Sequence, residues 1–67
     1  MADEIDLKPL RQAIHDLNNR VGVILATSEL LQLEQLSPKA MERTRTVEQK
    51  ALEVRDLLRS IADHYIK

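Results

Sequence analysis

The sequence contains no cysteine, phenylalanine or tryptophan, and only one tyrosine and one glycine among 67 residues. Without cysteine there are no disulfide bonds and no thiolate chemistry, which fits a reducing compartment. With so few aromatic residues and glycines, the chain lacks the bulk of a compact globule and the turns of a sheet. It is instead rich in Leu, Ala, Glu, Arg, Lys and Gln, which favour helices. We therefore expect a single all-α domain over residues 1–67.

Neither sign of charge dominates. Ten Lys and Arg face eleven Asp and Glu, giving a formal net charge of -1. The sequence therefore has no excess of basic residues, and we expect no nucleic-acid partner. The longest apolar run, residues 21–26, is too short for a membrane span, and residues 1–4 lack the features of a signal peptide. We expect a cytoplasmic protein with no membrane partner.

Two segments repeat apolar or small residues at alternating spacings of four and three. The first series is Leu10, Ile14, Leu17, Val21, Ile24, Ser28 and Leu31. The second series is Ala40, Thr44, Val47, Ala51, Val54, Leu58, Ile61 and Tyr65. We predict that each series forms the seam of a helix, meaning the apolar stripe by which the helix packs in a coiled coil. On this pattern Tyr65 is predicted to be a core aromatic residue.

Polar residues and prolines mark the ends of these helices. Asp6 is predicted to cap the first helix, with Pro9 in its first turn. Ser37 suits the N-cap of a second helix, and Pro38 suits its first position. The expected elements are a helix over about 6–35, a turn at 35–37 and a helix over about 38–65. Each would be about 40 Å long at 1.5 Å per residue.

A turn this short makes the helices antiparallel neighbours, a helical hairpin. One hairpin shields only one side of each helix, and both seams are flanked by further apolar residues, among them Leu25, Met41, Leu57 and Ala62. We therefore expect a homodimer in which two hairpins form a four-helix bundle. The alternative is a monomer with a partly exposed seam.

One stretch carries chemistry: His15-Asp16-Leu17-Asn18-Asn19. His15 lies one position off the seam, with Asn19 one turn further on. A neutral imidazole is a nucleophile near pH 7, an adjacent carboxylate can hold its second proton, and an amide can orient water or a phosphoryl oxygen. Gly22 leaves the surface beside them open. The alternative is a solvated His–Asp pair without function.

Residues 15–24 resemble the H-box of sensor histidine kinases, in the variant written His-Asp-x-Asn-Asn. The long helix, short turn and second long helix are similar to the dimerisation and histidine phosphotransfer domain (DHp, HisKA-like) of that family. The resemblance implies that His15 is the phosphoacceptor and that Asp16 is its acid/base partner. It further implies that Asn19 positions water when a partner receiver domain is dephosphorylated.

The chain departs from that family in two respects. Many members have a proline where this chain has Arg20, so we expect a straighter helix here. The sequence also has no phosphate-cradling loop for a nucleotide. We therefore expect phosphate to arrive in trans, from a receiver domain or from a kinase's ATP-binding domain, unless the chain is a fragment of a longer kinase. We expect no cofactor.

A second stripe runs along the outer face of the first helix through Asn19, Val23, Ala26, Leu30 and Leu33. Such stripes often mark docking surfaces, and the resemblance implies that receiver domains bind on this side. The alternative is that a broad bundle face buries some of these positions.

Antiparallel pairing would bring Arg55 and Arg59 near the height of His15, where they could neutralise phosphoryl charge; otherwise they are solvated arginines. His64 lies too far along the axis to share a metal with His15, so we expect no metal site.

The leading hypothesis is a phosphotransfer and dimerisation module of two-component signalling, which exchanges phosphate between His15 and a receiver aspartate. Two alternatives remain. One is a non-catalytic dimeric module that binds or sequesters a kinase or response regulator. The other is a bare dimerisation element.

Overall fold

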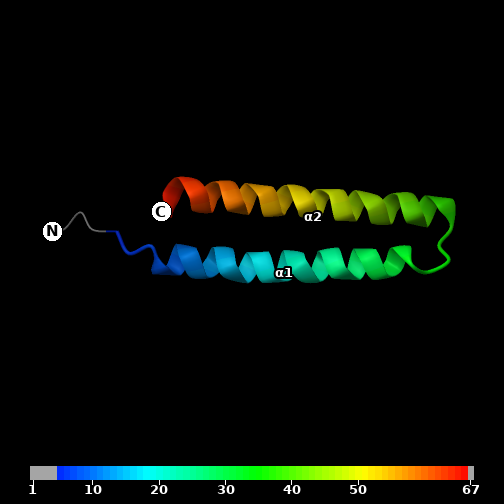
Figure 1. Cartoon of the computed structure of the whole chain (residues 1–67), viewed down its shortest axis with the longest axis horizontal. Coiled ribbons are helices and arrows are strands. Elements are labelled where there is room, and N and C mark those ends of the chain that lie inside the picture. Colours follow the sequence, from blue (N-terminus) through cyan, green and yellow to red (C-terminus); the bar gives the residue numbers. More distant parts are fainter. Residues whose placement is uncertain (1–4, 67) are drawn as a thin grey trace.

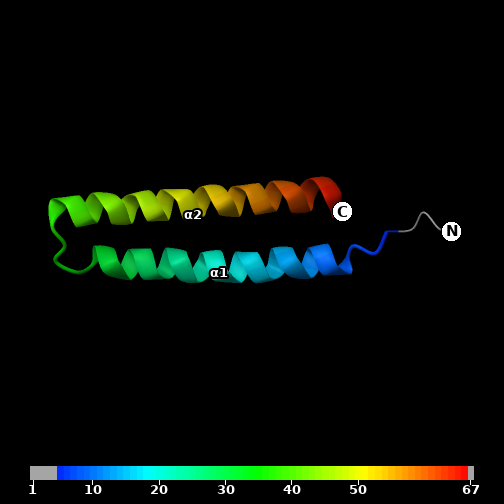
Figure 2. The ribbon, with the colours of Figure 1, turned by 180° about the vertical axis from the view of Figure 1, so that it is seen from behind.

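The computed structural model describes residues 5–66 as two helices, α1 (Lys8–Gln32) and α2 (Pro38–Tyr65). They run side by side in opposite directions, joined by residues 33–37 (Figure 1), and the view from behind shows the same arrangement (Figure 2). The structure measures 59 × 15 × 13 Å along its principal axes. Its two short dimensions leave no room for a third helix. The all-α antiparallel hairpin predicted from the sequence is confirmed.

The ends of α1 differ slightly from the prediction. Leu7, not Asp6, occupies the N-cap position and makes no side-chain cap. The Asp6 carboxylate instead accepts a hydrogen bond from the backbone N–H of Lys8, at 3.0 Å. At the other end, α1 stops at Gln32, because the next backbone N–H groups bond three residues back, to the carbonyls of Leu30 and Leu31. This tighter turn ends the helix about three residues early.

The start of α2 is as predicted. Ser37 has extended backbone angles, and its hydroxyl oxygen accepts a hydrogen bond from the N–H of Ala40 at 3.1 Å. Pro38 occupies the first position of the helix, where its missing N–H leaves no gap. This cap fixes where α2 begins, and therefore its register against α1.

The hairpin buries some positions of each seam and, on α1, also Leu25 beside the seam. The buried side chains among the described residues are Ile14, Val21, Leu25, Ser28, Ala51 and Leu58. The seam positions between them are 37–49% exposed: Leu10, Leu17, Ile24, Leu31, Val47, Val54 and Ile61. The prediction that Tyr65 is a core residue is wrong, because its side chain is 62% exposed. At this end of α2 it is Ala62 and Ile66, and not Tyr65, that pack against the core.

Candidate functional site

His15 lies in the second turn of α1 and is exposed, directly after the buried Ile14. The packing of Ile14 against α2 fixes the rotation of α1 about its axis. That rotation turns the next side chain out of the interface, into solvent. The helix continues without interruption through Arg20.

The carboxylate of Asp16 is held from its own helix. The side chain is half-buried, and its Oδ1 accepts a hydrogen bond from Nε2 of Gln12 at 2.9 Å. The backbone carbonyl of Asp16 accepts a further bond from the Arg20 guanidinium at 3.1 Å. Gln12 and Arg20 therefore bracket Asp16 one turn on either side.

Asn19 and Gly22 are exposed on the stretch of α1 that follows His15. A β-carbon added at Gly22 would meet no atom within 4 Å, so the glycine is not required by packing inside the hairpin. The surface at Gly22 is therefore open within the hairpin.

Replacing Gly22 with alanine should stabilise the protein. Glycine costs about 1 kcal/mol relative to alanine in a helix interior, and the new methyl group has free space. We expect the free energy of unfolding in urea to rise by about that amount per chain. A loss of stability would show that another molecule packs against Gly22 in solution.

A hollow beside His15 is lined by Lys8, Arg11, Gln12 and His15, all from the first turns of α1. Lys8 and Arg11 were not predicted from the sequence, although their spacing from the histidine, seven and four residues, places them on the same helix face. The arginines predicted from α2 do not line this hollow. Arg59 borders a separate one with Asp56, Ser60, Asp63 and His64, and Arg55 is exposed.

An apolar groove runs between the two helices in the middle of the hairpin. Its lining is Leu17, Arg20, Val21, Ile24, Thr46, Val47, Lys50, Ala51 and Val54. Lys50, at the edge, pairs with Glu53 at 3.3 Å. A hydrogen bond from Lys50 and a weaker contribution from a hydrogen bond with Gln49 lower the pKa of the Glu53 carboxyl. The floor of the groove is apolar and its charges lie at the rim.

The outer stripe of α1 is fully open in the hairpin. Val23 is 66% exposed and Leu30 is 64% exposed, and Ala26 between them is also exposed. Burial by the bundle face, the alternative considered from the sequence, does not occur within a single chain. The stripe is therefore available as a surface.

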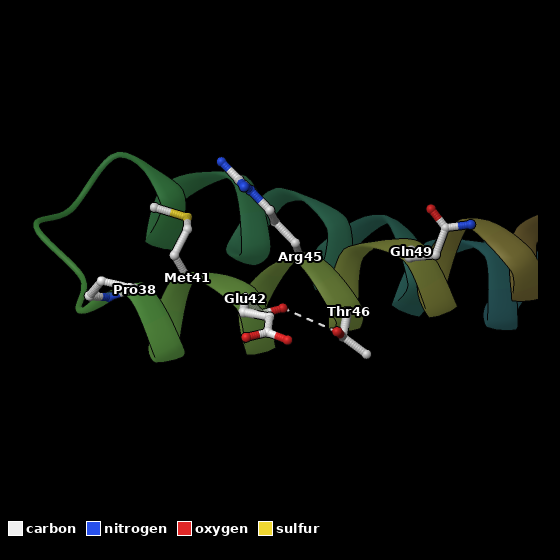
Figure 3. A pocket seen from close by; sticks show the side chains of 6 residues that line it. All are labelled: Pro38, Met41, Glu42, Arg45, Thr46 and Gln49. Atoms are coloured by element: carbon white, nitrogen blue, oxygen red, sulfur yellow. Dashed lines mark hydrogen bonds between the residues drawn. The ribbon is translucent and has the colours of Figure 1, made fainter.

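A further hollow near the start of α2 offers less chemistry. It is lined by Pro38, Met41, Glu42, Arg45, Thr46 and Gln49 (Figure 3). The Thr46 hydroxyl donates to the backbone carbonyl of Glu42 at 3.1 Å, the bond drawn in Figure 3, so its proton is already used. This hollow contains no histidine, and we assign no reaction to it.

Within residues 5–66, no group of three potential metal ligands comes together. Neither helix has, within that range, an apolar stretch of the length needed to cross a bilayer. No protein-family model, curated protein or solved structure matches the chain.

Proposed function

We propose that the chain is a histidine phosphotransfer and dimerisation module of two-component signalling. It takes a phosphoryl group on His15 and exchanges it with the aspartate of a receiver domain. One observation carries the proposal: the imidazole of the H-box-like stretch is exposed on a continuous helix, beside a carboxylate that is already oriented. A nucleophile that meets macromolecular partners needs this combination of access and fixed position.

In the proposed step, a neutral ring nitrogen of His15 attacks the phosphorus of the receiver's acyl phosphate. The N–P bond forms as the P–O bond to the aspartate breaks, and the aspartate leaves as a carboxylate. The proton on the other ring nitrogen passes to solvent, or is held by the free oxygen of Asp16. The reverse step returns phosphate to the receiver. Asn19, one turn on, would position water for hydrolysis.

Incubating the intact protein with a phosphorylated receiver, or with ATP and a kinase's ATP-binding domain, tests the proposal. Phosphohistidine is recognised because it is stable in base and labile in acid. We expect label with these two properties on the chain, and its absence with every donor would overturn the proposal.

The proposed module is a homodimer. The half-exposed seam residues Leu17, Ile24, Val47 and Val54 border the apolar groove, and a second hairpin placed on it would bury all four. The single chain needs this burial, because no large side chain in its described part is fully buried. Chains of this size rarely fold on so small a core without association.

We also propose that the receiver docks on the outer stripe of α1. The double variant Val23→Lys/Leu30→Lys should weaken receiver binding at least tenfold, because losing an apolar contact at the centre of an interface costs more than about 1 kcal/mol. Titration calorimetry with the receiver measures the loss. Leu57→Lys on α2 is the control, since Leu57 is equally exposed, at 63%. An equal loss in the control would contradict docking on this stripe.

A further inference from the structure

The hollow beside His15 has an unusual balance of charge. Lys8, Arg11, Gln12 and His15 follow one another at intervals of three, one and three residues, so they share one face of α1. Two of the four carry a permanent positive charge, and no acidic side chain lines the hollow. From Lys8 to His15 the helix rises only about 10 Å.

The neighbouring carboxylates are engaged elsewhere. Asp6 accepts from the backbone N–H of Lys8, and Asp16 accepts from Gln12. Among residues 5–66 the one salt bridge joins Lys50 to Glu53, so neither Lys8 nor Arg11 forms a salt bridge with a described residue. Both cations therefore face solvent next to the imidazole.

We infer that Lys8 and Arg11 form the binding site for the phosphoryl group that His15 receives. This inference rests on the proposed function and names the residues that hold its substrate. A phosphoryl group at neutral pH is a compact anion with several acceptor oxygens, which ammonium and guanidinium groups bind with charge-assisted hydrogen bonds. Lys8 and Arg11 are positioning residues: they hold the anion over the ring and offset its charge as the N–P bond forms.

Gln12 links this site to the acid/base partner. Its amide donates to Asp16 while its side chain lines the hollow. The carboxylate of Asp16 is therefore hydrogen-bonded to a side chain that lines the proposed phosphoryl site. Lys8 and Arg11 precede His15 on α1, so the anion would approach the ring from the N-terminal side of the helix.

Phosphoramidate tests the inference without any protein partner. The imidazole nitrogen attacks its phosphorus, the P–N bond of the reagent breaks, and ammonia leaves, taking up the proton released by the ring. The double variant Lys8→Gln/Arg11→Gln should form phosphohistidine about tenfold more slowly, since each exposed ion pair contributes up to about 1 kcal/mol. The control is Lys39→Gln/Arg43→Gln, which removes the same charge from the start of α2 and should keep the wild-type rate.

Amide NMR shifts measure binding separately from reaction. Inorganic phosphate, added at constant ionic strength, should shift residues 8–15 in the wild type and in the control, but not in Lys8→Gln/Arg11→Gln. The same titration is repeated with acetyl phosphate and with ATP. Tighter binding of acetyl phosphate would identify the donor as an acyl phosphate, and tighter binding of ATP would identify it as a nucleotide.

Equal slowing of the two double variants, or shifts spread over all basic residues, would overturn the inference. Phosphate binding at the hollow, with no transfer from any receiver or kinase, would instead remove the proposed function and leave the anion site standing.

Discussion

His15→Gln should reduce phosphoryl labelling of the chain to background. Glutamine keeps a polar side chain of similar length and favours helices, so α1 should remain intact while the only proposed nucleophile is lost. The side chain is exposed and contributes nothing to the buried seam, so the thermal midpoint should stay close to that of the wild type. Labelling by a phosphorylated receiver, followed by acid and base treatment, measures the effect.

The chain contains its own control for this experiment. His64 is the other histidine, exposed near the end of α2 with its ring 4.7 Å from that of Tyr65. His64→Gln should label as the wild type does. Full labelling of His15→Gln would refute the proposed role. Receiver binding that survives His15→Ala, without phosphohistidine in the wild type, would favour the non-catalytic module.

The two helices could be predicted because their signals are local. The alternating seams specify two amphipathic helices, and the Ser37–Pro38 pair specifies where the second begins, as the observed cap confirms. The end of α1 was harder to predict. It depends on a tight final turn at Leu33 and not on a proline or glycine in the sequence.

The seam pattern alone could not tell which positions the hairpin buries. In a four-three repeat, successive apolar residues lie alternately on the two edges of the apolar stripe. A single partner helix covers only one edge, so Ile14 is buried while Leu17 is 47% exposed. Tyr65 was misplaced for a related reason: the repeat continues to it, but Ala62 and Ile66 are the residues that pack against the core at that end of α2.

At the candidate site, the motif could predict only the residues that belong to it. The H-box-like stretch predicted an exposed His15 followed by Asp16 and Asn19, and the structure places all three on α1 as the spacing requires. Lys8 and Arg11 precede that stretch, so only the helix face connects them to it. Arg55 and Arg59 were proposed from height along the axis, which does not fix the rotation of α2.

Leu17→Lys/Val54→Lys should dissociate the proposed dimer. In the hairpin these side chains are 47% and 42% exposed, so the chain alone tolerates lysine, whereas a second hairpin on the groove would bury both. A dimer contains four substituted positions. At about 1 kcal/mol or more each, the loss is about 4 kcal/mol, or three orders of magnitude in Kd. Lysine is a better helix former than valine, so helix propensity does not contribute to the loss.

Sedimentation equilibrium should give twice the 7.7 kDa chain mass for the wild type and a single chain mass for this variant. The wild type's thermal midpoint should also rise with protein concentration, because association stabilises the fold by mass action. Val23→Lys/Leu30→Lys is the matched control: it makes the same two exchanges, valine and leucine to lysine, outside the groove. It should remain dimeric. A wild type that sediments as one chain, or a control that dissociates equally, would show that the groove is not where two copies meet.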